Sequence, residues 1–291
     1  MSGAVSDPTS EPTSEPTSGS GSGSGTVLFE FADGVGTVTL NRPERRNAIS
    51  WQLVQDLLAA IERARSQDGL RVLVLTGAGS AFCVGADLAR VASDDPRDND
   101  TRTLRGRSVA DDIERLTRAS TVVEALVSFP MPTIAAINGA CAGAGLALAL
   151  AADIRIAAEN AAFNSAFISA GVSGDFGSAW LLSRAVGDAR ARALLLDPAK
   201  FTAAEAFAWG LVTEITADLP GRLAELSGKI AAQPPKAMRY AKQNLADAGR
   251  ATLSDYLRRE VPRMVDSAHS GDAKRAAQAF LEKRKPVFTG E

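Results

Sequence analysis

Side chains that commonly carry enzyme chemistry are scarce in this sequence. The only histidine, His269, lies in a polar stretch near the C-terminus, and the two cysteines, Cys83 and Cys141, lie inside apolar stretches. A Ser-His-Asp or Cys-His site would have to use His269, and no metal-ligand spacing surrounds it. We expect the cysteines to be reduced core thiols and the protein to be cytoplasmic. Any chemistry must therefore depend on carboxylates or on backbone groups.

Two glycine-rich segments have the pattern of backbone sites. "TGAGSAFCVGADL" (76–88) and "INGACAGAGLALALAAD" (137–153) each run from a strand through a glycine turn into a helix, expected to begin near Asp87 and near Gly145. Glycine lets a ligand approach the peptide NH groups closely, and a helix N-terminus leaves NH donors unpaired. Two such turns facing each other would form a two-donor oxyanion hole. The alternative is that both are tight strand–helix corners, because single glycine motifs carry little weight.

The hydrophobic pattern predicts the elements that hold these turns. A short, fully apolar run predicts a strand buried on both faces at 72–76, and two more buried strands are expected at 133–137 and 154–157. Two more strands are expected at 27–31 and 37–41. Helical periodicity predicts one helix capped by Ser50 and others at 111–128, 179–186, 189–195 and 203–209. Strands alternating with helices indicate an α/β core, and beyond Leu219 the chain is expected to be all-helical.

Composition limits the classes of function. The net charge of −2 in 291 residues shows no basic excess, so we predict no nucleic-acid binding. The longest apolar run, 140–152, is about 13 residues against the roughly 20 that span a bilayer, so we predict no membrane span. Residues 1–25 are Ser/Thr/Pro/Glu repeats followed by a Gly-Ser run, which predicts a disordered tail or linker.

Six motifs in order carry a family resemblance. They are "NRPERRNAIS", "VLVLTGAGSAFCVGADL", "PMPTIAAINGACAGAGLALALAADIRIAAENAAF", "GDFGSAWLLSRAVGDARA", "AEAFAWGLVTEI" and "AFLEKRKPVF". Together they resemble the enoyl-CoA hydratase/isomerase superfamily, the crotonases, over residues 26–288. The resemblance implies a crotonase-type spiral of ββα units in residues 26–218. It also implies a helical C-terminal region, 219–291, that forms homotrimers, often paired into hexamers.

The same resemblance assigns site residues. The backbone NH groups of Ala86 and Ala144 would hold the thioester oxygen of an acyl-CoA as it becomes an enolate. The positions that would line the CoA path are Arg46, Ala48, Gly85, Asp87, Leu88, Phe280 and Lys283. Phe280 and Lys283 commonly approach from a neighbouring subunit, and the alternative for Arg46 and Lys283 is a solvated surface charge. No metal or redox cofactor is implied, because coenzyme A is part of the substrate.

The acids that hydratases of this family use to activate water are missing. Ala147 and Phe167 occupy the two glutamate positions, and neither can carry a proton. A different acid is present in "GVSGDFGSAWLLSR" (171–184), which resembles a segment of ring-1,2-epoxyphenylacetyl-CoA isomerases and related double-bond isomerases. Their catalytic aspartate falls on Asp175. One carboxylate suits a 1,3-proton shift while the oxyanion hole holds the enolate.

The surroundings of Asp175 leave one alternative open. Apolar neighbours such as Phe167, Phe176 and Trp180 are expected to raise the pKa of its carboxyl group. The alternative is that Asp175 caps the helix that begins near Gly177. Three departures from the family segment leave the aim of Asp175 open, at Gly174, Ser178 and Ser183. Of two other acids at family positions, Asp87 is expected to cap its helix and Asp153 to support the fold.

The sequence therefore predicts an acyl-CoA isomerase or lyase with a backbone oxyanion hole and Asp175 as the proton shuttle. One alternative is a non-catalytic acyl-CoA-binding subunit. Another is a different enolate reaction, such as thioester hydrolysis or C–C cleavage, because the family changes its reaction by moving one or two acids on a shared scaffold. Enoyl-CoA hydratase is the generic family label but fits the residues less well.

Overall fold

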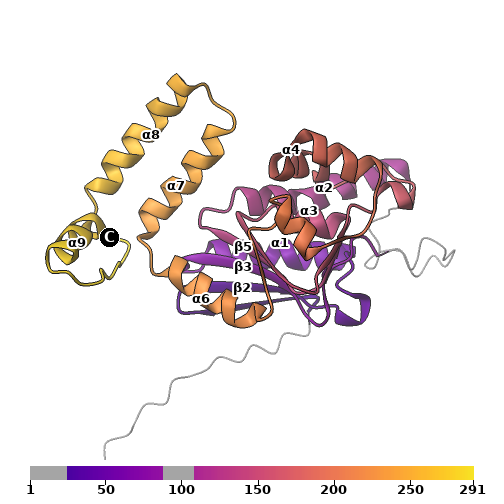
Figure 1. Ribbon diagram of the computed structural model, residues 1–291, viewed down its shortest axis with the longest axis horizontal. Helices are drawn as coiled ribbons and strands as arrows, with labels where there is room; N and C mark the ends of the chain where they lie inside the picture. Colours follow the sequence, from indigo (N-terminus) through magenta and orange to yellow (C-terminus); the bar gives the residue numbers. More distant parts are fainter. Residues whose placement is uncertain (1–24, 88–107) are drawn as a thin grey trace, which may run out of the picture.

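A computed structural model of the protein describes residues 25–87 and 108–291, which form two sheets and surrounding helices (Figure 1). In the large sheet, β1 and β2 are antiparallel and the neighbours from β2 to β10 are parallel. In order across this sheet the strands are β1 (Val27–Ala32), β2 (Val35–Leu40), β3 (Val72–Gly77), β5 (Thr133–Ile137), β7 (Ile154–Ala158) and β10 (Glu214–Thr216). The small sheet contains β4 (Ala81–Cys83), β6 (Ala140–Ala142), β8 (Ala162–Asn164) and β9 (Phe201–Thr202).

The described residues also form a series of α-helices between and after the strands. They are α1 (Trp51–Arg65), α2 (Val109–Val127), α3 (Ala144–Leu150), α4 (Ser178–Leu196), α5 (Ala203–Ala208), α6 (Leu219–Ala231), α7 (Pro235–Ala248), α8 (Leu253–Ala268) and α9 (Gly271–Leu281). Two short 3-10 helices are η1 (Pro43–Arg45) and η3 (Ile168–Ala170). In the described residues, no helix is both long and apolar enough to cross a membrane.

The strands alternate between the two sheets. The pairs β3–β4, β5–β6 and β7–β8 each place their first strand in the large sheet and their second in the small one. Along the described residues these pairs are followed by α2, α3 and α4 respectively. The predicted α/β spiral of ββα units is therefore confirmed, and it brings the ends of β4, β6 and β8 to one edge.

The central strands β3 and β5 of the large sheet are buried on both faces, as their apolar sequences predict. Leu73 and Leu75 of β3 point into the main core, where helices α1 and α2 pack. The alternate residues Val72 and Val74 point the other way and pack against α6, including Leu219. Strand residues alternate between faces, so a strand with apolar residues at every position needs a layer on each side.

Most of the predicted strands and helices are present in the structure. The predicted strands at 27–31, 37–41, 72–76, 133–137 and 154–157 are present within one or two residues. Ser50 caps α1 as expected, since its Oγ accepts a hydrogen bond from the NH of Leu53 at 3.2 Å. The separate helices at 179–186 and 189–195 are confirmed, because the backbone at Gly187, with φ of 74° and ψ of 160°, is not helical and divides α4 at this residue. The helix expected near Asp87 and the tail at 1–24 lie outside the described residues.

From Leu219 to Leu281 the chain is mainly helical, as predicted, but residues 282–291 form no helix. Neither α7 nor α8 contains a buried residue. The two helices form a hairpin beside the sheets, and α9 lies near the foot of α7 (Figure 1). Lys242 of α7 fastens this hairpin to the core, since its Nζ lies 2.7 Å from an Asp153 carboxylate oxygen and donates to the carbonyl oxygen of Met131 at 3.0 Å. The division into a core at 26–218 and a helical region at 219–291 stays a prediction.

Candidate active site

The small sheet aligns the two glycine turns. In the parallel pair β4 and β6, Cys83 lies opposite Cys141. Ala86 and Ala144 each come three residues after the paired cysteine, so the two turns leave the sheet at matching positions. The turns are in close contact, since a Cβ placed on Gly85 would lie 3.5 Å from the backbone nitrogen of Ala144. Glycine is required here, because φ at Gly85 is 91°.

The backbone pattern leaves the NH groups of Ala86 and Ala144 as available donors. The NH of Ile49 donates to the carbonyl oxygen of Gly85 at 2.8 Å, and the NH of Asp87 donates to that of Ile49 at 3.0 Å. In a parallel bridge of this kind, the NH of the residue between, Ala86, points away from the bridging strand. Ala144 is the first residue of α3, where an NH has no acceptor within the helix. Within 25–87 and 108–291, we find no hydrogen bond donated by either NH.

The carboxylate of Asp175 is partly buried and lacks a hydrogen-bond partner on one oxygen among the described residues. The residue is half-buried, and its Oδ1 is buried with no hydrogen-bond partner among the described residues. This burial raises the pKa of its carboxyl group from 3.8 to about 6. The alternative that Asp175 caps α4 was wrong, because the N-cap is Gly177 and no side chain caps the helix. The main-chain carbonyl of Asp175, by contrast, accepts from the NH of Ser178 at 3.0 Å.

The loop before α4 has a shape that a proline would not permit. Gly174 has φ of 121°, whereas a proline ring fixes φ near −65°. Phe176 and Gly177 also have positive φ, at 51° and 67°. Glycine at position 174, where the family segment has proline, therefore permits a backbone conformation that proline could not adopt. Asp175 is half-buried in this conformation.

Phe167 connects the two parts of the site. A Cβ placed on Gly143 would lie 4.0 Å from Cε1 of Phe167, and one placed on Gly174 would lie 3.8 Å from its Cδ2. The ring therefore lies between the turn that precedes Ala144 and the segment that precedes Asp175. Phe167 is 7% exposed, so it excludes water from this place.

The other two predicted apolar neighbours of Asp175 differ from each other. Phe176 is 2% exposed and packs in the main core. Trp180 is 44% exposed, and its ring centroid lies 3.6 Å from the guanidinium carbon of Arg184. Burial raises the pKa of the Asp175 carboxyl group, and Trp180 is the most exposed of the three predicted aromatic neighbours.

Asp87 ties the first turn to the segment that carries Arg46 and Ala48. Its carboxylate oxygens lie 2.9 Å from Arg42 and 2.6 Å from Arg45. Arg42 also donates to the carbonyl oxygen of Ala48 at 2.5 Å. Neither arginine was predicted as a site residue, and the only signal in the sequence is the run of arginines in "NRPERRN".

The predicted CoA-path residues fall into two groups. Ala48 and Gly85 are buried at the first turn, and Arg46 is exposed beside it, in the left-handed region with φ of 50°. Leu88 lies outside the described residues. Phe280 is 83% exposed on α9, and Lys283 follows that helix. Figure 1 shows α9 on the far side of the molecule from α3, so the fold of one chain does not bring these two residues to the turns.

The remaining titratable groups have structural surroundings. Asp153 Oδ2 accepts hydrogen bonds from the NH and hydroxyl of Thr133 at 2.8 and 2.9 Å, in keeping with a supporting role. Burial raises the pKa of Cys83 to about 12 and that of Cys141 well above its usual range, so both stay protonated. His269 is exposed, and its Nδ1 lies 2.8 Å from the carbonyl oxygen of Val265. Among residues 25–87 and 108–291, no three His, Cys, Asp or Glu side chains are grouped to hold a metal ion.

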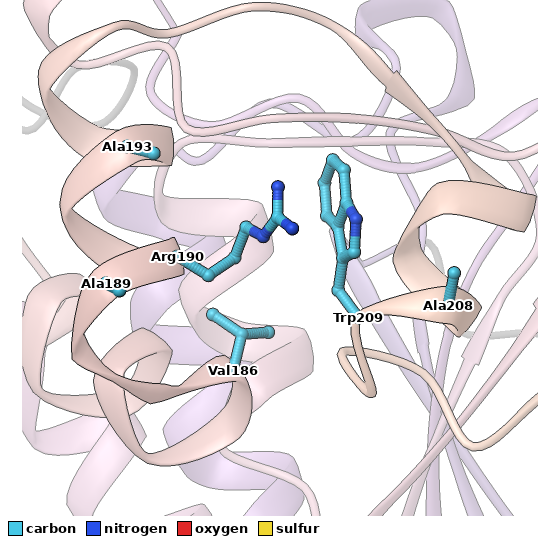
Figure 2. A pocket seen from close by; sticks show the side chains of 6 residues that line it. All are labelled: Val186, Ala189, Arg190, Ala193, Ala208 and Trp209. Carbon is cyan, nitrogen blue, oxygen red and sulfur yellow. The ribbon is translucent and has the colours of Figure 1, made fainter.

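A surface groove of about 550 Å³ lies away from these turns, between α4 and α5. Figure 2 shows the Arg190 guanidinium beside the ring of Trp209, and its central carbon lies 4.4 Å from the ring centroid. The other lining residues are Val186, Ala189, Ala193 and Ala208. The groove therefore includes none of the residues of the candidate active site.

Fold and site together define an α/β spiral with paired strand–turn–helix donors. The chain belongs to the enoyl-CoA hydratase/isomerase family, whose sequence profile matches residues 30–291. It is 36% identical over 271 residues to 1,2-epoxyphenylacetyl-CoA isomerase of Escherichia coli, covering 91% of this chain and 98% of that protein. It is 39% identical over 272 residues to a probable enoyl-CoA hydratase of Rhodobacter capsulatus, covering 91% and 98%. The crystal structure of an enoyl-CoA hydratase from Bacillus anthracis matches with a TM-score of 0.83 at 31% identity, covering 91% of this chain and all of that one.

Proposed function

We propose that the protein is an acyl-CoA isomerase that moves a proton within an enolisable thioester. The observation that carries this proposal is the Asp175 carboxylate, half-buried and with Oδ1 unpartnered, on the segment that packs through Phe167 against the Ala144 turn. A carboxylate with a pKa of about 6 is mostly ionised at neutral pH and is a stronger base than an ordinary aspartate. The similarity to an enzyme named as an isomerase adds support.

In the proposed reaction, the NH groups of Ala86 and Ala144 donate to the thioester oxygen. Asp175 removes a proton from the carbon next to the thioester, and the electron pair moves onto that oxygen to form an enolate. The protonated Asp175 then returns the proton at a different carbon, and the thioester carbonyl is restored. Two backbone donors fixed by the β4–β6 pairing stabilise the enolate more than the substrate, because the negative charge develops on the oxygen they face.

The residues at the hydratase positions argue against water addition. Ala147 is fully buried on α3, and Phe167 fills the space between the Gly143 turn and the Gly174 loop. A methyl group and an aromatic ring neither orient nor deprotonate a water molecule. Isomerisation, which needs one acid and no water, fits these residues better.

We place the CoA moiety along Arg46, Ala48, Gly85 and the Asp87–Leu88 turn. In this proposal Phe280 and Lys283 come from a neighbouring chain of a homotrimer or hexamer. The support is that both lie far from the turns of their own chain, and that α8 presents an uncovered apolar face. No cofactor is needed beyond the coenzyme A of the substrate itself.

Turnover of 3-enoyl-CoA and ring-1,2-epoxyphenylacetyl-CoA substrates tests the proposal. We expect wild type to isomerise at least one of them, and Asp175→Asn to lose about 10²-fold or more in kcat. Asp188→Asn, which removes an exposed acid from α4, the helix that follows Asp175, should leave the rate unchanged. Equal rates in wild type and Asp175→Asn would eliminate Asp175 as the shuttle. Acyl-CoA binding without turnover of any substrate would favour a non-catalytic binder.

A further inference from the structure

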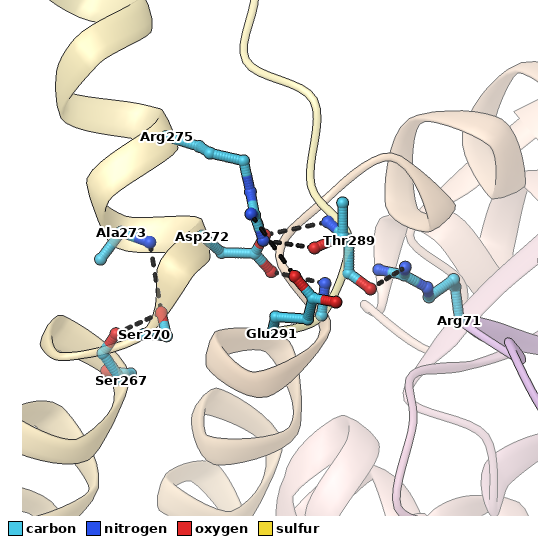
Figure 3. A network of polar contacts seen from close by, with 9 residues as sticks. Arg71, Ser267, Ser270, Asp272, Ala273, Arg275, Thr289 and Glu291 are labelled. Atoms are coloured by element: carbon cyan, nitrogen blue, oxygen red, sulfur yellow. Dashed lines mark hydrogen bonds and ion pairs between the residues drawn. The ribbon is translucent and has the colours of Figure 1, made fainter.

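The last residues of the chain fold back and close a network around Asp272. Its Oδ1 accepts a hydrogen bond from the NH of Thr289 at 2.9 Å, and its Oδ2 accepts one from the NH of Gly290 at 3.0 Å. In return, the NH of Asp272 donates to the carbonyl oxygen of Glu291 at 3.1 Å. Figure 3 shows these contacts at the first turn of α9. The segment 289–291 is called the C-terminal strap below.

Two arginines complete the network. Arg275 of α9 lies 2.8 Å from Asp272 Oδ1 and also donates to the hydroxyl of Thr289. Arg71, immediately before β3, donates to the carbonyl oxygen of Thr289 at 3.2 Å (Figure 3). Gly290 packs against α7 as well, because a Cβ there would lie 3.1 Å from Cγ of Pro235. The strap therefore joins α9 to the core strand that leads to the first oxyanion turn.

Asp272 holds the strap in place. It is 2% exposed, and the only other buried residue of α9 is Ala279. Burial disfavours the charged form, but the donors from Arg275, Thr289 and Gly290 outweigh it and lower the pKa of the carboxyl group. A buried carboxylate with four donors is strongly held, because charge-assisted hydrogen bonds are about twice as strong as neutral ones.

We propose that Asp272 is a positioning residue that, through the C-terminal strap, fixes the orientation in which α9 presents Phe280 and Lys283. This inference rests on the proposed function, in which those two residues contact CoA. α9 makes its described contacts mainly with α8 and the strap, so the strap is its tie to the large sheet. Asp272 itself touches neither substrate nor reacting atoms, and it acts only through the helix it holds.

The test compares full-length wild type with Asp272→Asn and with a chain lacking residues 289–291. Asparagine keeps the shape of Asp272 but loses the charge, and the deletion removes the partners instead. In both variants we expect amide hydrogen exchange in α9 to rise about tenfold or more while β3 stays protected. The dissociation constant for acetyl-CoA, measured by calorimetry, should rise about fivefold, with KM rising and kcat staying within about twofold.

Asp255→Asn is the matched control, since Asp255 is also an acid in the first turn of a C-terminal helix but is exposed and bonded to Thr252. It should change neither α9 exchange nor acetyl-CoA affinity. Unchanged α9 exchange in Asp272→Asn, or faster exchange with wild-type affinity, would overturn the inference while the proposed function stands. Exchange that rises equally in β3 would show a general structural role and would also overturn it. Failure of wild type to bind acetyl-CoA would overturn the proposed function and this inference with it.

Discussion

At the scale of single residues, the acids of this protein differ in how many donors they have. Asp87 binds two arginines, Asp153 binds Thr133 and Lys242, and Asp272 binds the strap. Asp175 alone of these four has a buried oxygen without a partner among the described residues. A buried polar atom without a partner costs stability, so its presence indicates a function that needs it.

The raised pKa of Asp175 predicts the pH dependence of turnover. A general base must be ionised, so kcat/KM should rise about tenfold per pH unit below the apparent pKa and level off above about 6. Measuring initial rates with 3-enoyl-CoA from pH 4.5 to 8 gives this profile. A midpoint near the ordinary aspartate value of 3.8 would contradict the burial of the carboxylate in the working enzyme.

The same group predicts a change in stability. Its folded pKa of about 6 exceeds the ordinary 3.8, so the folded state binds the proton more tightly than the unfolded chain does. The free energy of unfolding therefore falls as pH rises from about 4 to 6, and the loss persists above 6. Because Asp175 is partly exposed, we expect Asp175→Asn to stabilise the protein at pH 7.5 by about 1 to 2 kcal/mol. Urea unfolding at pH 4 and 7.5 measures this, and Asp188→Asn should show no such gain.

At the scale of elements, the oxyanion turns depend on backbone conformations that only glycine adopts easily. Gly85→Ala forces a side chain onto φ of 91° and brings a Cβ to 3.1 Å from the carbonyl oxygen of Ala142. We expect the two turns to separate and kcat/KM to fall about 10²-fold to 10³-fold, as when one oxyanion donor is lost. Steady-state kinetics with the best isomerisation substrate measures this loss.

Gly187→Ala separates the effect on the turns from the cost of positive φ. Gly187 has φ of 74°, and a Cβ there would meet nothing within 4 Å. Both substitutions should lower the free energy of unfolding by about 1 to 3 kcal/mol, because both place alanine at a positive φ that glycine adopts more easily. Only Gly85→Ala should lose turnover, and an equal loss in both would show that the effect is on stability alone.

The elements also show what the sequence can and cannot predict. β3 and β5 are predictable, because strands buried on both faces leave a short apolar run in the sequence. β4, β6 and β8 have three residues each, too short to show a period. The pairing of β4 with β6 brings the two turns together, so the glycine pattern alone suggested an oxyanion hole without proving one. Likewise, the sequence suggests that Asp175, three residues before the first residue of α4, caps that helix. The positive φ of Phe176 and Gly177, which the sequence does not reveal, separates Asp175 from the helix start.

At the scale of the whole molecule, the C-terminal helices expose an uncovered apolar surface. Helix α8 has five large apolar side chains on one face, each 44% or more exposed: Leu253, Leu257, Val261, Met264 and Val265. Exposed apolar stripes of this size mark association surfaces in soluble proteins. The same region carries Phe280 and Lys283, which we place at a neighbour's CoA. Assembly and substrate binding are thus expected to depend on one surface.

The double variant Leu257→Glu/Val261→Glu tests this link. Two carboxylates on the α8 face would be costly to bury, so we expect sedimentation to shift from a trimer or larger species to a monomer. The monomer should bind acetyl-CoA about tenfold or more weakly, because Phe280 and Lys283 would no longer reach a neighbouring site. Asp255→Lys, which changes charge on the opposite side of α8, should keep both the assembly and the affinity. A monomer that binds acetyl-CoA as tightly as wild type would contradict the contribution of a neighbouring chain, because the CoA site would then be complete within one chain.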